Sequence, residues 1–306
     1  MGSRYPSYLN LLKAGELERR AEEAWKGLED CHLCPRNCGV NRLRGQKGVC
    51  RVLDRPVVAS YGPHFGEERP LVGRHGSGTI FMSYCNLACV FCQNYDISQE
   101  GEGLPVSHEK LAGMMLSLQE QGCHNINIVS PSHVIPMILK ALVIAAREGL
   151  RRPLVYNTGG YDAVDSLRLL DGVVDIYMPD MKYHHPEVGL RFSLARDYPE
   201  RNREAVKEMH RQVGDLVIRD GLAVKGLLVR HLVLPEGQAG TREILRFLAR
   251  EISPRTYVNI MAQYRPAHRA RRFPPLDRSL TLKEYREAIQ VAREEGLTRL
   301  DEENGL

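Results

Sequence analysis

The sequence predicts an α/β fold, an open (β/α)6 partial TIM barrel with an N-terminal Cys-rich metal-binding segment. From Thr79 onward, six short and largely apolar runs of strand-forming residues alternate with segments of helical period. That order is typical of a parallel sheet covered by helices. Four of the cysteines lie together within residues 31–50, in a stretch rich in glycine and arginine. We therefore expect an N-terminal helix over 1–30, a Cys-rich metal-binding segment over 31–75 and the partial barrel over 76–306.

The strands and helices can be located in chain order. Residues 7–29 carry apolar side chains at helical spacing among charges, which indicates an amphipathic helix. The six predicted strands are Thr79–Ser83, Asn125–Val129, Leu154–Thr158, Val173–Met178, Gly226–Leu234 and Tyr257–Gln263. A helix is expected to begin after the N-cap Ser107 and end at Gly122, and others cover 133–148, 162–170, 200–213, 241–252 and 281–295. An eight-stranded barrel usually needs roughly 250 residues, more than follow Thr79, so the open six-stranded form is favoured.

Composition and charge exclude several classes of protein. The chain is 43% hydrophobic and 26% charged, which is ordinary for a globular protein of 306 residues. A net charge of +4 does not indicate a nucleic-acid partner. Nothing near the N-terminus resembles a signal peptide, and no apolar run reaches the roughly 18 residues of a membrane span. We therefore predict a cytoplasmic protein without a membrane partner.

The cysteines are the main chemical signal, because seven of the eight fall in the first third of the chain, in two groups. In a reducing compartment such groups bind metal more often than they form disulfides. Cys85, Cys89 and Cys92 follow the first predicted strand, at the barrel end where active sites are built. Three thiolates this close can hold one iron–sulfur cubane and keep one iron open. The alternatives are a structural zinc site, which would recruit a fourth ligand such as His75 or His108, and thiols that bind no metal.

The other group, Cys31, Cys34, Cys38 and Cys50, supplies four thiolates within a short segment. This number suits either tetrahedral zinc or a fully ligated iron–sulfur cluster. So short a segment has little core of its own, and a metal would fold it. An iron–sulfur cluster could pass electrons to the first site, whereas zinc could not. Both metals stay open on the sequence, with iron–sulfur favoured, and four metal-free thiols are the remaining alternative.

The spacing Cys-x3-Cys-x2-Cys, with Phe91 directly before the last cysteine, resembles the signature of the radical S-adenosylmethionine (SAM) superfamily. The resemblance implies a [4Fe–4S] cluster at Cys85, Cys89 and Cys92, with SAM chelating its open iron. It also implies one-electron cleavage of SAM to a 5′-deoxyadenosyl radical that abstracts hydrogen from a substrate. Phe91 would then lie beside the cofactor.

Further passages resemble the pyruvate formate-lyase activating enzyme branch, and most closely its uncharacterised activating-enzyme-like iron–sulfur proteins. The passages are Cys31–Cys38, Gly76–Phe81, Cys92–Ser98, Val173–Tyr183 and Val229–Pro235. The resemblance implies that Asp180 helps to hold a monovalent cation and that Lys182 reaches the SAM carboxylate. Arg230 would be a second cationic contact, and Asn157 and Thr158 would serve the cation and the ribose.

Four further positions carry expectations. Ser130 stands where the activating enzymes have Gly-Gly-Glu-Pro, whose backbone receives the SAM amino group. His133, shortly after it, is either an active-site group or the first residue of the next helix. Gln263 and its neighbour Tyr264 are expected to line the adenosine or substrate pocket.

The sequence thus predicts a radical SAM oxidoreductase supplied with electrons by a donor such as flavodoxin or ferredoxin. The leading expectation is that it installs a glycyl radical on a partner enzyme by hydrogen abstraction. The alternative is radical modification of a small molecule or a peptide in cofactor biosynthesis. A third possibility from another class is a non-catalytic Fe–S electron carrier or zinc scaffold.

Overall fold

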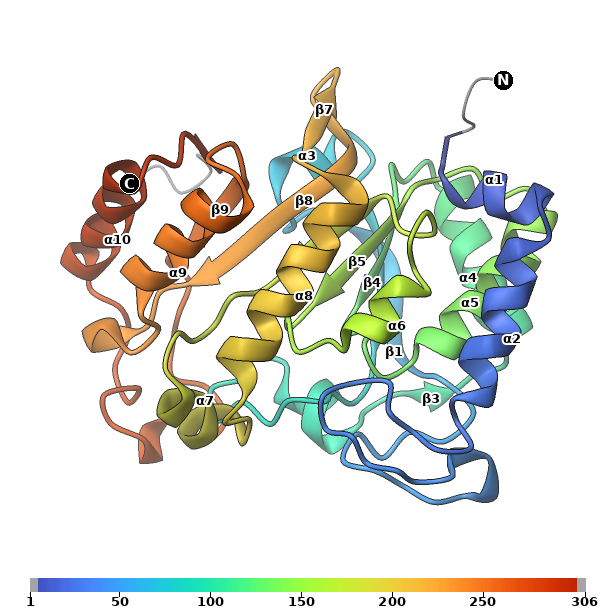
Figure 1. The fold of residues 1–306 in the computed structure, drawn as a ribbon, viewed down its shortest axis with the longest axis horizontal. Helices are drawn as coiled ribbons and strands as arrows, with labels where there is room; N and C mark the ends of the chain where they lie inside the picture. The colour runs from blue at the N-terminus through green and yellow to red at the C-terminus, as the bar shows by residue number, and fades with distance from the viewer. Residues whose placement is uncertain (1–4, 302–306) are drawn as a thin grey trace.

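The computed structural model describes residues 5–301, and its centre is one mainly parallel sheet (Figure 1). Six parallel strands lie side by side in chain order: β2 (Ser77–Met82), β4 (Ile126–Val129), β5 (Leu154–Thr158), β6 (Ile176–Pro179), β8 (Leu222–Leu232) and β9 (Tyr257–Met261). These are the six predicted strands, with ends shifted by a few residues. The path through the sheet ends at β10 (Arg299–Leu300) on one side and β3 (Leu104–Pro105) on the other, so the sheet formed by residues 5–301 is open.

The sheet contains strands that the sequence pattern did not predict. β1 (Val57–His64) pairs antiparallel with β2 and carries β3 on its other edge, although it lies in the segment expected to be only Cys-rich. It contains Gly62 and Pro63, which are loop signals in a sequence, but pairing on both sides overrides them. β7 (Val217–Arg219) forms an antiparallel hairpin with the start of β8.

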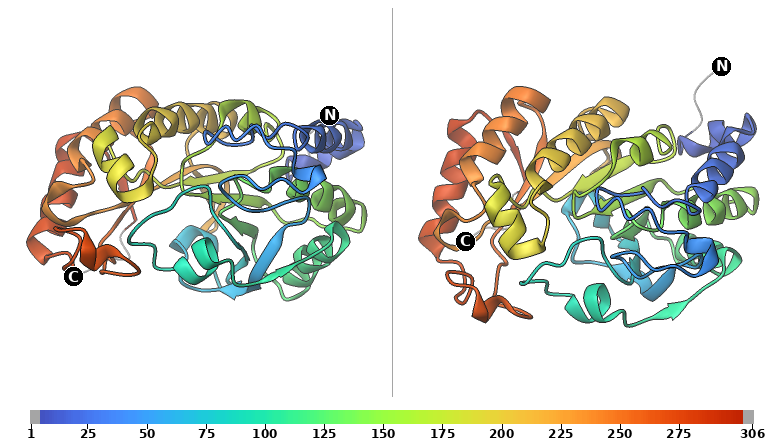
Figure 2. Two further views of the ribbon diagram at one scale, coloured as in Figure 1. Left: turned by 90° about the horizontal axis from the view of Figure 1, so that it is seen from below. Right: turned by 60° about the horizontal axis from the view of Figure 1, so that its bottom comes forward.

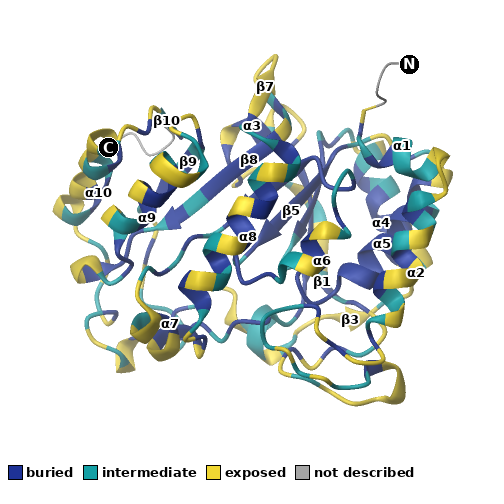
Figure 3. Cartoon of the chain, in the orientation of Figure 1, coloured by how far each residue is buried: buried dark blue, intermediate teal, exposed yellow. Residues whose placement is uncertain are grey.

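Helices follow the strands and form an arc outside the sheet (Figure 2). They are α4 (His108–Glu120), α5 (Ile135–Arg147), α6 (Val164–Arg168), α7 (Pro186–Ser193), α8 (Tyr198–Val213), α9 (Thr241–Phe247) and α10 (Leu282–Glu294), besides the short α3 (Arg69–Val72). The Ser107 side chain accepts a hydrogen bond from the Lys110 N–H at 3.2 Å, as its predicted capping role requires, and Thr281 forms a capping box with Glu284. The six parallel strands are largely buried, while the hairpin strand β7 and the outer faces of the helices are exposed (Figure 3).

The N-terminal region forms two helices, α1 (Tyr8–Lys13) and α2 (Glu16–Lys26), where one was predicted. Gly15 separates them because its φ of +71° lies in the left-handed region. α2 packs on α5 through apolar residues such as Leu17 and Ala21, which are buried. The Cys-rich loops that follow lie beside the segment after β2 (Figure 2). Within residues 5–301, no helix combines the length and apolar character that a membrane crossing needs.

Two buried histidines make the fold sensitive to acid. Burial lowers the pKa of both His133 and His231 to about 4, and each ring donates a hydrogen bond to a backbone carbonyl. In the unfolded chain a histidine takes up its proton near the ordinary pKa of about 6.5, whereas in the folded chain these two do so only near pH 4. The stabilisation of the folded state by the neutral histidines is therefore complete above about pH 6.5 and is lost as the pH falls from there through 4.

We expect each buried histidine to lower the free energy of unfolding of the apoprotein by up to about 3 kcal/mol across that pH range. Urea unfolding at a series of pH values measures the effect. His133→Gln should reduce the pH dependence, because glutamine carries no such proton. Replacing the exposed His185 by glutamine is the control and should leave the pH dependence unchanged. Equal pH dependence in the His133 variant and the wild type would show that the burial of His133 has no such effect.

Candidate active site

A cavity of about 250 Å³ lies at the carboxyl ends of the parallel strands. Eleven of the residues predicted for the first site line it: Cys85, Cys89, Phe91, Cys92, Ser130, Asn157, Thr158, Asp180, Lys182, Arg230 and Gln263. These residues come from the loop after β2 and from the ends of β4, β5, β6, β8 and β9. Because parallel strands end at the same edge of a sheet, the fold gathers side chains that are far apart in the sequence.

The loop after β2 carries three cysteines whose sulfur atoms each have a polar neighbour. The Leu87 N–H donates to Cys85 Sγ at 3.4 Å, and Ser193 Oγ donates to Cys89 Sγ at 3.0 Å. Cys92 Sγ lies 3.1 Å from the hydroxyl of Ser98. Burial raises the pKa of the Cys85 thiol to about 12, so formation of its thiolate requires a bound cation. The roles of both serines were missed, since neither follows from their sequence positions.

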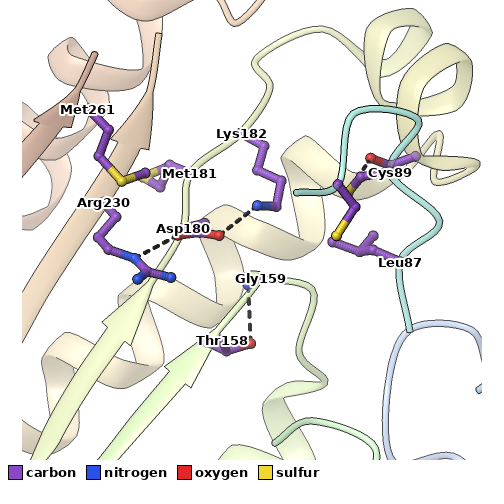
Figure 4. Close-up of polar contacts among 12 residues, drawn as sticks. Leu87, Cys89, Thr158, Gly159, Asp180, Met181, Lys182, Arg230 and Met261 are labelled. Carbon is purple, nitrogen blue, oxygen red and sulfur yellow. Dashed lines mark hydrogen bonds and ion pairs between the residues drawn. The ribbon is translucent and has the colours of Figure 1, made fainter. Parts of the chain in front are cut away.

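Three charged side chains form a buried network on the cavity wall (Figure 4). Asp180 accepts hydrogen bonds from Lys182 Nζ at 2.6 Å and from Arg230 Nε at 2.9 Å, and Arg230 Nη2 donates to Asn157 Oδ1 at 2.7 Å. The Asp180 and Lys182 side chains are only 13% and 15% exposed, so this is no surface ion pair. Burial alone would raise the pKa of Asp180, but Arg230 and Lys182 outweigh it and hold that pKa below its usual range. Lys182 lies between Asp180 and Cys89, and its ammonium points to the Asp180 carboxylate (Figure 4).

Sequence reasoning missed Glu67, which lies behind this network. Its carboxylate is 3.9 Å from Arg230 Nη1 and is almost completely buried. Burial raises the pKa of Glu67 to about 7. It is contributed by the segment before α3, which lies outside the passages that carry the resemblance, so no pattern indicated it.

The ends of β5 and β6 are tied together by α8. The Tyr198 hydroxyl accepts from the Lys182 N–H at 3.1 Å and contacts the carbonyls of Gly159 and Asp180 at 2.9 and 3.0 Å. Asn202 Nδ2 donates to the carbonyls of Gly160 and Asp180, both at 2.9 Å. These buried bonds fix the backbone from which Asp180 and Lys182 project.

Two expectations about neighbouring residues were wrong. His133 is buried outside the cavity, where it donates to the Ser83 carbonyl at 3.0 Å, so it is neither an active-site group nor part of α5, which begins at Ile135. Tyr264 is also absent from the cavity lining. Its hydroxyl donates to the Leu276 carbonyl at 2.6 Å, and its ring packs edge-on against Phe91. Both side chains contact the loop after β2 from outside the cavity.

The second cysteine group lines a separate and smaller cavity. Cys31, Cys34, Cys38 and Cys50 surround it together with Arg42. In the part of the chain that the structure describes, no three or more histidine, cysteine, aspartate or glutamate side chains are arranged as ligands of a single metal ion. The four thiols therefore surround one cavity, but their sulfur atoms are not arranged around a single point as the ligands of one metal ion would be.

Comparisons with known proteins agree with this geometry. A family model described as the radical SAM superfamily matches residues 79–247, more than half of the chain. The uncharacterized protein MJ0674 of Methanocaldococcus jannaschii is 32% identical over 299 residues, covering 94% of this chain and 82% of the relative.

Two solved structures are more distant. A radical SAM methyltransferase from Sphaerobacter thermophilus and HydG, a maturase of the [FeFe]-hydrogenase, are each 14% identical with a TM-score of 0.48. The matches cover 72% and 71% of this chain but only 64% and 49% of those chains. This chain thus spans less than two thirds of either solved chain. The family match and the 32% identical relative nevertheless establish that the chain belongs to the radical SAM superfamily, whose members reductively cleave SAM at a [4Fe–4S] cluster.

Proposed function

We propose that this radical SAM enzyme abstracts a hydrogen atom from a backbone glycine of a partner protein, as activating enzymes of glycyl radical enzymes do. The observation that carries the proposal is that the sheet is open. β3 and β10 end the sheet, and no strand within residues 5–301 closes the barrel. We infer that an open sheet lets a loop of another protein approach the cavity, which a closed barrel would exclude.

The residues of the cavity fit a cluster with three protein ligands. Cys85, Cys89 and Cys92 line one wall, and hydroxyl groups lie within 3.1 Å of two of their sulfur atoms. Hydrogen bonds of this kind stabilise the thiolate form of a ligand. When bound, the cluster supplies the electron that breaks the S–C5′ bond of SAM, which yields methionine and the 5′-deoxyadenosyl radical. The external electron would come from a donor of the flavodoxin or ferredoxin class.

The charged network fits the amino-acid part of SAM. Lys182 and Arg230 offer two buried cations to a carboxylate, and Asp180 orients both through the hydrogen bonds described above. Asp180, Asn157 and Thr158 also provide oxygen atoms for a monovalent cation. We assign the backbone carbonyl of Ser130 to the SAM amino group, and Phe91 and Gln263 to the walls around the adenosine.

A metal at the second cysteine group is also part of the proposal. The convergence of Cys31, Cys34, Cys38 and Cys50 on one cavity supports it, because clustered thiols in a segment with little core are typical of metal-folded modules.

Transfer of deuterium tests the leading proposal. A panel of purified glycyl radical enzymes labelled with deuterium at glycine Cα is incubated with the reduced, reconstituted protein and SAM. The proposal predicts deuterium in the released 5′-deoxyadenosine and the doublet of a glycyl radical in electron paramagnetic resonance. Panel members whose radical-site glycine is replaced by alanine are the control and should show neither signal.

Release of unlabelled 5′-deoxyadenosine, without a glycyl radical in any member of the panel, would refute this proposal. It would favour radical modification of a small molecule or peptide. One observation supports that alternative: the cavity contains Ser130, with φ +58°, in place of the glycine-rich segment of activating enzymes. A non-catalytic carrier or zinc scaffold does not account for the buried cations Lys182 and Arg230 beside the cysteine loop.

A further inference from the structure

We propose that Cys31, Cys34, Cys38 and Cys50 bind a second iron–sulfur cluster, and that Asn86 connects it to the catalytic cluster as an electron relay. The inference rests on the metal site included in the proposed function and commits to its chemistry and role. It is carried by a chain of contacts between the two cysteine groups, which belong to different segments of the sequence.

The second cavity is built for an anionic occupant. Arg42 lines it and is 2% exposed. Its Nε donates to the Leu53 carbonyl at 2.9 Å and its Nη1 to the His133 carbonyl at 2.8 Å, while Nη1 lies 3.9 Å from Cys31 Sγ. Its Nη2 is buried without a hydrogen-bond partner. A buried guanidinium is costly unless an anion lies nearby, and four thiolates on a metal centre carry the required negative charge.

The backbone of this segment also approaches sulfur closely. The Val49 N–H points to Cys38 Sγ at 3.5 Å. A Cβ on Gly48 would come within 2.9 Å of the same sulfur, so only glycine fits there without displacement. Backbone N–H groups directed at ligand sulfurs are a recognised means of adjusting the potential of an iron–sulfur cluster.

Asn86 joins the two cysteine groups directly. It is 3% exposed and follows Cys85 in the catalytic loop. Its Nδ2 donates to the Tyr161 carbonyl at 2.6 Å and its Oδ1 lies 3.8 Å from Cys85 Sγ, while the same side chain also lies beside the Cys34 thiol. One amide group thus lies beside a ligand position of each site. A zinc ion with a purely structural role would need no such contact.

Arg36, in the Cys-rich segment, fixes the position of this segment relative to the catalytic loop. Its Nε donates to the Asn86 carbonyl at 2.7 Å, and its Nη2 donates to the Ser193 carbonyl at 3.1 Å. Ser193 is the residue whose hydroxyl donates to Cys89 Sγ. The Cys-rich segment is therefore hydrogen-bonded both to the catalytic loop at Asn86 and to Ser193, which contacts Cys89 of that loop.

Exposed side chains surround the second site, so a protein electron donor can dock beside it. Around it, Leu43 and Val49 are 37% and 54% exposed, and the cations Arg44 and Lys47 are exposed as well. Mixed apolar and basic surface fits an acidic one-electron protein donor of the flavodoxin class. A cluster held by the four cysteines would take one electron from the donor and, through the Asn86 contact, supply it for the one-electron cleavage of the SAM S–C5′ bond.

The test compares two electron donors on anaerobically prepared protein. The double variant Cys34→Ala/Cys38→Ala should lose about half of the iron and sulfide and one of the two signals that the reduced wild type shows in electron paramagnetic resonance. It should lose SAM cleavage driven by reduced flavodoxin but keep cleavage driven by dithionite, a small reductant that can reach the catalytic cluster directly. Cys123→Ser, a buried cysteine outside both groups, is the control and should keep both rates.

Asn86→Ala tests the relay with both clusters present. We expect unchanged iron content and a flavodoxin-driven rate about tenfold lower, together with a weaker magnetic interaction between the reduced clusters. Zinc in place of the second cluster in the wild type would overturn the proposal, as would a full flavodoxin-driven rate in either variant. Because dithionite-driven cleavage and iron analysis need no protein substrate, a missing glycyl radical would refute the proposed function and leave this inference standing.

Discussion

Replacing Asp180 with asparagine is expected to lower SAM cleavage about 100-fold at limiting SAM. The carboxylate accepts hydrogen bonds from Lys182 and Arg230 within a buried cavity. Removing its charge leaves Lys182 without its carboxylate partner and Arg230 with only the more distant Glu67, in surroundings that screen the two cations poorly. Removing one partner from a buried ion pair typically costs about 3–5 kcal/mol. We expect this loss to displace Lys182 and Arg230 from the positions in which they bind SAM. Equilibrium dialysis of SAM and chromatography of 5′-deoxyadenosine measure the binding and cleavage steps separately.

Asp165→Asn is the matched control for this prediction. Asp165 also pairs with an arginine, Arg168 at 2.9 Å, but its side chain is 92% exposed and lies away from the cavity. An exposed pair contributes little, so this variant should bind and cleave SAM as the wild type does. Equal activity of the two variants would contradict the role assigned to the buried network.

Replacing Gly160 with alanine is expected to reduce the free energy of unfolding by about 4 kcal/mol and to abolish SAM binding. Gly160 has φ +76°, and a Cβ there would lie 2.2 Å from the Asp180 carbonyl oxygen and 2.3 Å from Asn202 Nδ2. Both atoms belong to the hydrogen bonds that tie the ends of β5 and β6 together, so the clash moves the backbone that carries Asp180 and Lys182.

Gly15→Ala separates the clash from ordinary backbone strain. Gly15 has φ +71°, but a Cβ there meets no atom within 4 Å. This control should therefore show only the strain of a left-handed alanine, about 1 kcal/mol, with normal SAM binding. Urea unfolding gives both free energies. If both variants lose the same free energy of unfolding, the close packing around Gly160 has no effect beyond that of its positive φ.

The six parallel strands could be predicted because each is a short apolar run buried between helices, and this pattern is visible in the sequence. The lining residues Asn157 and Asp180 were predicted from the resemblance to the activating enzymes, which places polar side chains at the ends of these strands. β1 could not, because its Gly62 and Pro63 resemble loop residues and only its pairing with β2 and β3 makes it a strand. The break at Gly15 was missed because the apolar period continues across it.

Side chains that contact the site from outside the motifs could not be predicted from the sequence either. Ser193 contacts a catalytic cysteine across more than a hundred residues, and Glu67 contacts Arg230 from the segment before α3. Asn86 lay inside the recognised motif, yet its importance depends on the approach of the Cys-rich segment, which no local pattern describes. Long-range packing decided each of these contacts.

SAM cleavage by Cys89→Ser tests the central claim most directly. Wild type, Cys89→Ser and the control Cys123→Ser are reconstituted without oxygen, reduced with dithionite and assayed for 5′-deoxyadenosine, with iron counted in each. The cluster assigned to Cys85, Cys89 and Cys92 predicts release by the wild type and by Cys123→Ser, and none by Cys89→Ser. No release by iron-loaded wild type, or equal release by Cys89→Ser, would contradict the assignment.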